Sequence, residues 1–241
     1  MRIYSSYHDY HSLMRKNNVI VEIPGGTSTP QKDWYPFVMT FNDKSFKSKV
    51  GEEIDLSILY NFGAFKNGHS PLYDENSHYY NSFYGAYIIE CKEKQKVYGF
   101  NNKEVNIEEI SAVASHDIEA LVLDSMGCIN PHVCFQNRGK PKILDYISYN
   151  NWAVIDCNIY MNSSIHQYNR DCISYIQYGK PPKDYKGDNF PEATLAGRIY
   201  CRYFPEYNVS ILLYIIAPDF EIIEETDREI LSRTKITSSD N

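Results

Sequence analysis

The longest apolar run in the sequence, VSILLYIIA at residues 209–217, most constrains the fold. A transmembrane helix needs about 20 apolar residues, whereas a strand, at roughly 3.3 Å per residue, suits a run of this length. The preceding segment, AGRIYCRYF at 196–204, is also strand-like, and the turn formers of FPEYN lie between the two. The pattern therefore predicts an antiparallel hairpin over residues 196–217.

The alternation of side chains along a strand decides which residues of this hairpin share a face. It places three polar residues on one face of the first strand: Arg198, Tyr200 and Arg202. If position 203 pairs with position 209, the apolar residues of both strands collect on the opposite face. If position 204 pairs with 209, the arginines face the apolar residues of the second strand. Because an unpaired buried arginine costs several kcal/mol, we predict the first register.

The rest of the chain contains further strand patterns. Alternating and β-branched residues predict strands at 18–24, 34–41 and 83–92. Residues 143–161 predict two more strands, joined by a hairpin turn at Asn150-Asn151. The sequence is therefore expected to be rich in strands.

Helices are predicted in three places. Apolar residues recur at helical spacing over 107–126. The predicted inward stripe of this helix is Ile110, Val113, Ile118, Leu121 and Val122. A serine N-cap predicts a short helix up to about residue 177, and the capping-box pattern Thr226-Asp-Arg-Glu229 predicts a last short helix.

Together these elements predict an α+β fold, in which a mostly antiparallel sheet has about three helices packed against it. The sequence has no internal repeat, no low-complexity linker and no abrupt change of composition, so we expect a single domain over residues 1–241. We also predict a long irregular loop over 61–82, which is rich in turn formers, and a frayed tail over 236–241.

Composition and charge constrain where the protein is expected to reside and which partners it is expected to bind. The N-terminus, MRIYSSYHDYHSLMRKNN, lacks the apolar segment of a signal peptide, so we expect a soluble cytoplasmic protein whose six cysteines are thiols, with no membrane contact. The net charge of −7 argues against non-specific binding to nucleic acid, whose affinity comes from Lys and Arg meeting phosphates. The abundance of Asn, Ile and Lys in this tyrosine-rich, acidic chain indicates an AT-rich bacterial or phage genome.

The stretch GCINPHVCF, at residues 127–135, combines Cys128, His132 and Cys134. Structural zinc is held by four tetrahedral nitrogen or sulfur ligands, and this pattern supplies three at most. Nothing in the spacing nominates a fourth ligand. Because a free cysteine packs as a small apolar residue, we expect buried thiols without metal or cofactor, with a metal site at these three residues as the alternative.

Catalytic motifs do not assign a reaction. The sequence contains no Walker loop, no dinucleotide-binding glycine fingerprint, no GxSxG and no HExxH. His116-Asp117 matches the metal-binding doublet of some phosphohydrolases, whose fold is all helical and needs further His and Asp ligands. An exposed pair on a helix is therefore the simpler interpretation.

The candidate ligand site combines the arginine-bearing strand face with the tyrosine-rich run SHYYNSFYGAY, at residues 77–87. Arginine reads carboxylates and phosphates through paired hydrogen bonds, and tyrosine combines a large contact area with a polar tip. The predicted ligand-binding residues are Arg198, Tyr200, Arg202, Tyr80 and Tyr84. The alternative is a solvated sheet on which the arginines pair with carboxylates.

These features favour an intracellular binding or accessory module that recognises a small anionic ligand or a protein partner. The alternative is an enzyme that acts on a phosphorylated or nucleotide-like small molecule. Such an enzyme would use an arginine clamp and a base drawn from His78, His116 or Asp124. Because the sequence shows no convergent acid–base pair, the binding module is the preferred hypothesis.

Overall fold

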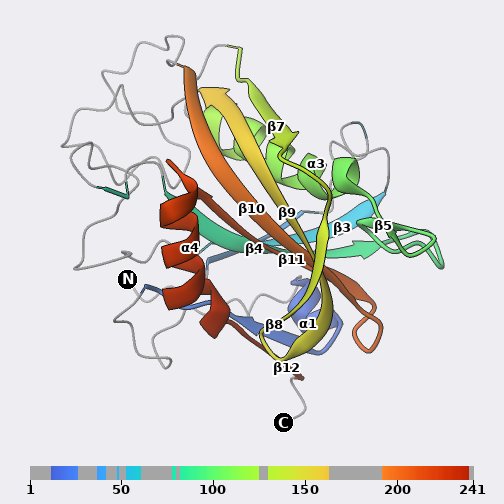
Figure 1. The fold of residues 1–241 in the computed structure, drawn as a ribbon. Coiled ribbons are helices and arrows are strands. Elements are labelled where there is room, and N and C mark those ends of the chain that lie inside the picture. Colours follow the sequence, from blue (N-terminus) through green and yellow to red (C-terminus); the bar gives the residue numbers. More distant parts are fainter. Residues whose placement is uncertain are drawn as a thin grey trace, which may run out of the picture.

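A large antiparallel sheet forms the centre of the computed structural model (Figure 1). The structure describes residues 12–26, 37–41, 48, 53–60, 78–79, 82–124, 130–162 and 192–238. Eight strands form the sheet in the order β2-β3-β4-β11-β10-β9-β7, and β8 pairs with β9 as well. Their bounds are β2 (Phe37–Phe41), β3 (Ile54–Tyr60), β4 (Phe83–Cys91), β7 (Val133–Asn137), β8 (Lys142–Tyr146), β9 (Tyr149–Asn162), β10 (Glu192–Phe204) and β11 (Val209–Ala217).

The smaller elements lie on both faces and at one end of this sheet. Two short antiparallel pairs are β1 (Val19–Glu22) with β12 (Lys235–Ser238), and β5 (Phe100–Asn101) with β6 (Glu104–Val105). The helices are α1 (Leu13–Lys16), α3 (Ile107–Asp117), its π-helical continuation η3 (Ile118–Asp124), α4 (Phe220–Glu229) and the 3-10 turn η5 (Leu231–Arg233). Within the part of the chain that the structure describes, no helix has both the length and the apolar character needed to cross a membrane.

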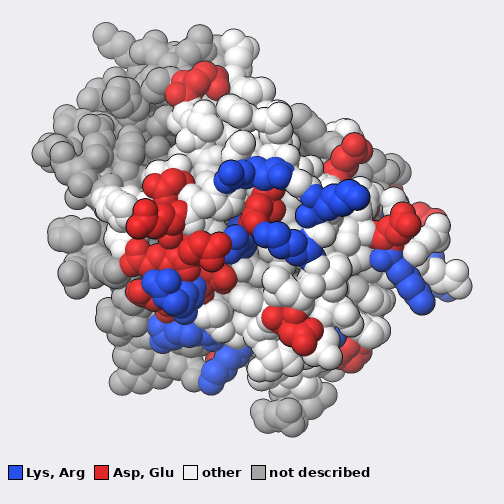
Figure 2. Space-filling model, viewed as in Figure 1, with Lys and Arg blue, Asp and Glu red and all other residues white. Residues whose placement is uncertain are grey.

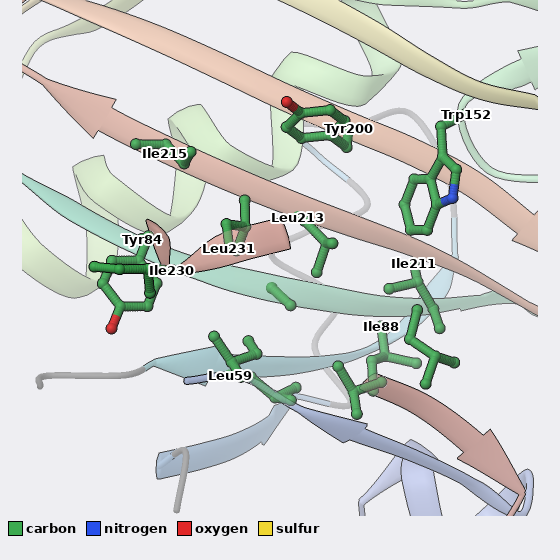
Figure 3. Packing of buried hydrophobic residues seen from close by; sticks show 14 of the residues in the cluster. Leu59, Tyr84, Ile88, Trp152, Tyr200, Ile211, Leu213, Ile215, Ile230 and Leu231 are labelled. Carbon is green, nitrogen blue, oxygen red and sulfur yellow. The ribbon is translucent and has the colours of Figure 1, made fainter. Parts of the chain in front are cut away.

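Both faces of the sheet are buried, and this explains the apolar run of β11. On one face, Ile110 and Val113 of α3 pack with Leu212 in a first core cluster. On the other face, α1, α4 and the β1–β12 pair cover Leu213 and Ile215 in a second cluster, part of which Figure 3 shows. Every position of β11 is therefore buried, and each fully buried Leu or Ile contributes roughly 1.5–3 kcal/mol to stability.

The predicted register of the β10–β11 hairpin is wrong. Phe204, and not position 203, lies opposite Val209, so Arg198 and Arg202 lie opposite Ile215 and Ile211. A single apolar face would favour the predicted register, but a strand that is buried on both faces gives no such preference. The turn also fixes the register, because the N–H of Tyr207 donates to the carbonyl of Phe204 at 3.1 Å and that of Asn208 donates to Pro205 at 3.3 Å.

Two further turn and cap predictions are corrected. The turn between β8 and β9 lies at Ile147 and Ser148, both with positive φ (41° and 69°), and Asn150-Asn151 is already inside β9. The pattern at 226–229 is the last turn of α4 and not its start, because the side chain of Asp219 caps this helix by accepting from the N–H of Ile222 at 3.0 Å.

Other predictions hold in part. Residues 107–117 form α3 and residues 118–124 continue as a π-helix, with Ile110, Val113 and Ile118 buried as predicted. The side chains of Leu121 and Val122, residues 163–177 and most of the 61–82 loop lie outside the described residues. The frayed tail is wrong for residues 236–238, because they belong to β12 and pair with β1.

The described residues confirm a strand-rich α+β architecture with a mostly antiparallel sheet. The total number of helices and the single domain remain predictions, because they also depend on segments outside the described residues.

Candidate functional site

Arg198 is the first residue of the predicted site, and its guanidinium is engaged by carboxylates. Its side chain is only 10% exposed and lies between β9 and α4. Its Nε donates to Asp156 at 2.7 Å, and its Nη2 donates to Glu224 at 2.7 Å. Burial lowers the pKa of Arg198, but the hydrogen bonds to Glu224 and Asp156 outweigh this and raise it above its ordinary value. The guanidinium is thus charge-compensated within the protein.

Tyr200 belongs to the same network on the α4 face. Its hydroxyl donates to Asp227 at 2.6 Å, and the hydroxyl of Tyr146, from β8, donates to the other oxygen of that carboxylate. The two phenol rings stack with their centroids 4.1 Å apart and an interplanar angle of 8°. Burial, reinforced by the charge of Asp227, raises the pKa of both phenols. The network therefore fastens α4 to β8 and β10.

The described tyrosines of the run 77–87 have different environments. Tyr84 is 1% exposed, packs in the core cluster shown in Figure 3, and donates its hydroxyl to the carbonyl of Pro24 at 2.6 Å. Tyr80 lies outside the described residues. The neighbouring Tyr79 donates to Glu225 of α4 at 2.8 Å, so its hydroxyl also meets a carboxylate.

Among the cysteine and histidine candidates, the expected burial of the thiol is wrong for Cys134. Cys128 lies outside the described residues, whereas His132 and Cys134 are exposed, the latter on β7. Cys157 and Cys201 are buried, and burial raises the pKa of the Cys157 thiol to about 12. Among the described residues, no group of three or more His, Cys, Asp or Glu side chains could hold a metal ion.

The bases considered for an enzyme have different environments. His116 is half-buried in α3. Its neighbour Asp117 is buried and accepts a hydrogen bond from the Tyr87 hydroxyl at 2.8 Å, so the predicted exposed pair is wrong for Asp117. His78 is exposed in the short described segment before β4. The side chain of Asp124 lies outside the described residues.

Arg202 lies two residues after Tyr200 on the same strand, and its environment differs from that of Arg198. Its Nε donates to the backbone carbonyl of Asn150 at 2.9 Å. Its guanidinium carbon lies 4.2 Å from the ring centroid of Phe204 and 4.9 Å from that of Tyr149. These contacts fix the planar group through cation–π attraction. No carboxylate of the described chain forms an ion pair with it.

Arg202 lines a cavity of about 970 Å³ at the end of the sheet. The opposite wall comes from the loop that follows β4. The lining side chains are mainly cationic, amide and aromatic: Glu93, Lys94, Gln95, Lys96, Val97, Phe100, Asn101, Asn102, Lys103, Asn151, Arg202 and Tyr203. Four cations thus meet one carboxylate around this space, and an excess of positive charge attracts anions.

The loop wall is tied to the rest of the molecule. Gly99 has φ +84°, and a Cβ atom there would lie 2.9 Å from the sulfur of Cys201 in β10. The N–H of Gly99 donates to the side chain of Glu109 in α3 at 2.7 Å. Asn102 and Lys103, with φ of 50° and 72°, form the tight turn between β5 and β6. The wall is therefore anchored to both α3 and β10.

The lysines of this loop differ in their partners. Lys92 pairs with Asp55 at 3.2 Å and does not line the cavity. Burial raises the pKa of Glu109, and the nearby charge of Lys96 partly opposes that rise. Lys94 and Lys103 are exposed, and neither forms an ion pair with a carboxylate of the described chain. Two cations besides Arg202 are therefore uncompensated at the cavity.

The acidic surface lies elsewhere on the molecule. Figure 2 shows carboxylate side chains gathered over the position that α4 occupies in Figure 1. The acidic residues of this helix are Glu221, Glu224, Glu225, Asp227 and Glu229. This negative surface, together with the engaged guanidinium of Arg198, makes the α4 face unfavourable for an anion.

Of the predicted site residues that the structure describes, only Arg202 lines the cavity. Sequence reasoning missed the lysine-rich stretch KEKQK at 92–96 and Lys103, since charged turns between strands are common. The excess of lysine over glutamate in this turn was the available signal. No protein family, curated protein or solved structure matches this chain.

Proposed function

We propose that the protein is a binding module that takes a small anionic ligand in the cavity between loop 93–103 and the end of β10. The observation that carries this proposal is the set of cavity cations without a carboxylate partner among the described residues: Arg202, Lys94 and Lys103. Five other described cations are ion-paired: Lys16, Lys92, Lys142, Arg198 and Arg228.

Electrostatics favours this cavity over the rest of the surface. The chain carries a net charge of −7, so an anion is repelled by the molecule at long range and attracted only where cations are concentrated. The fixed guanidinium of Arg202 lowers the ordering cost of binding, because stacking and its bond to Asn150 already restrain it. The exposed Lys94 and Lys103 supply further positive charge around it.

Binding is favoured over catalysis by the chemistry of the lining. The described residues that line the cavity include no histidine, cysteine or aspartate, and Glu93 is their one carboxylate. An enzyme acting on a phosphorylated or nucleotide-like molecule would need an acid–base pair or a nucleophile in reach of the ligand. The enzyme is therefore the weaker proposal.

Calorimetric titration with inorganic tripolyphosphate tests the binding function. We expect saturable binding to one site at low salt, weakened by 150 mM salt because exposed charges are screened. The double variant Lys94→Gln/Lys103→Gln should bind about tenfold more weakly or worse, since charge-assisted hydrogen bonds contribute about 1.5–3 kcal/mol each. The matched control is Lys140→Gln, which removes an exposed lysine that does not line the cavity.

Two results would count against this function. The first is the absence of saturable binding at low salt. The second is an equal loss of affinity in the double variant and in the Lys140→Gln control, which would indicate general charge attraction without a site.

A further inference from the structure

The aromatic lining of the cavity narrows the class of anion. Phe100 from β5 and Tyr203 from β10 both line it, and each is only partly buried. The hydroxyl of Tyr203 donates to Asn208 at 3.0 Å, which restrains the ring. Partly exposed aromatic faces beside cations are the combination on which nucleic-acid bases stack. A bare phosphate would use the cations and leave these rings without a partner.

Amide side chains surround the same space. They come from the loop and from β9: Gln95, Asn101, Asn102 and Asn151. Each amide offers both donors and an acceptor, which matches the mixed donor and acceptor edge of a base. A ligand that carried only phosphate oxygens would use their donors and leave the carbonyls unpaired. The lining therefore suits a ligand with both charged and uncharged polar groups.

The charge and the size of the cavity indicate a ligand with more than one phosphate and a ring system. A phosphate monoester carries about −1.5 to −2 charges at neutral pH. Three lining cations, Arg202, Lys94 and Lys103, have no carboxylate partner among the described residues, so their charge exceeds that of one phosphate. The cavity volume of about 970 Å³ lies at the upper end for small-molecule sites, which leaves room for a ring system beside the phosphates.

From these observations we infer that the ligand is a nucleoside polyphosphate, with its phosphates at Arg202 and the loop lysines and its base against Tyr203 and Phe100. This inference rests on the proposed anion-binding function and specifies its ligand. The free nucleotide is favoured over a nucleic-acid strand, because a strand has one charge per nucleotide and the cations are concentrated in one cavity.

Four probes in magnesium-free buffer test the inference: adenosine triphosphate, inorganic tripolyphosphate, adenosine and a short single-stranded oligonucleotide. Adenosine triphosphate should bind about fivefold or more tightly than tripolyphosphate, the increment expected from stacking one base. Tyr203→Leu should remove this advantage while leaving tripolyphosphate binding within about twofold. Phe100→Leu is a second variant with the same expected pattern, and circular dichroism verifies that both fold.

The outcomes separate the two proposals. Equal affinity for adenosine triphosphate and tripolyphosphate, unchanged by either aromatic variant, would overturn the nucleotide inference and leave anion binding intact. Tighter binding of the oligonucleotide than of the triphosphate would also overturn it. Loss of saturable binding for all four probes would overturn both proposals.

Discussion

At the scale of single residues, two arginines of one strand face show how neighbours decide a side chain's role. Arg198 and Arg202 are four positions apart on β10, yet the first meets Asp156 and Glu224 while the second meets aromatic rings and a cavity. Their shared face was predictable from strand alternation. Their different partners were not, because Glu224 comes from a helix later in the chain.

Arg198→Ala should lower the free energy of unfolding by about 3 kcal/mol, since it leaves the half-buried carboxylate of Asp156 without its main partner. Urea denaturation followed by circular dichroism measures the effect. The exposed pair of Arg228 and Glu229 provides the control, and Arg228→Ala should cost less than about 1 kcal/mol. Equal effects of the two substitutions would contradict the network.

The same ion pair predicts a pH dependence. Burial raises the pKa of Asp156, but the hydrogen bond and charge of Arg198, with help from Lys142, outweigh it and hold the pKa below its ordinary value. A carboxylate with a lowered pKa in the folded state stabilises above its unfolded pKa of about 3.9, and this contribution is lost as pH falls through the folded value.

We therefore expect the stability difference between the wild type and Asp156→Asn to be largest near neutral pH. It should narrow as the pH is lowered from about 5 towards about 2. Urea midpoints of both proteins across this range measure it. A difference that stays constant over the whole range would show that the carboxylate of Asp156 is not held ionised by Arg198.

At the scale of elements, strands and helices with strong periodicity were predictable, and their ends and pairings were not. The run at 209–217 is β11 and the helical pattern at 107–126 contains α3, because burial preserves both periods. The predicted hairpin register was wrong because both sheet faces are buried. The turn at Ile147 and Ser148 was not predicted because neither residue type favours positive φ.

The N-terminus of α4 gives a test at this scale. Asp219→Ala should destabilise the protein by about 1 kcal/mol, because the carboxylate caps the helix at the N–H of Ile222. Glu229→Gln, at the other end of the helix, should change stability by no more than about 0.5 kcal/mol. Thermal or urea denaturation compares the two. A larger effect at Glu229 would favour the capping-box start at Thr226 that the sequence pattern suggested.

At the scale of the whole molecule, the candidate site is assembled from segments far apart in the chain. Residues of the loop at 93–103 line one cavity together with Asn151 of β9 and residues 202–203 of β10. Gly99 fits against Cys201 where a larger residue would collide. Sequence patterns indicated an arginine-bearing face, yet α4 covers its first half and leaves only the end at Arg202 beside the cavity. Which residues distant in sequence lie close together depends on the sheet order, and local spacing in the sequence does not predict it.

Hydrogen–deuterium exchange with and without saturating tripolyphosphate tests the central claim, that the anion binds at this cavity, most directly. Binding stabilises the contacted segments against local opening. We predict slower exchange in loop 93–103 and at residues 150–151 and 202–203, no change over α4, and no added protection in Lys94→Gln/Lys103→Gln. Protection centred on α4 and residues 198–200, or no protection anywhere, would contradict the account.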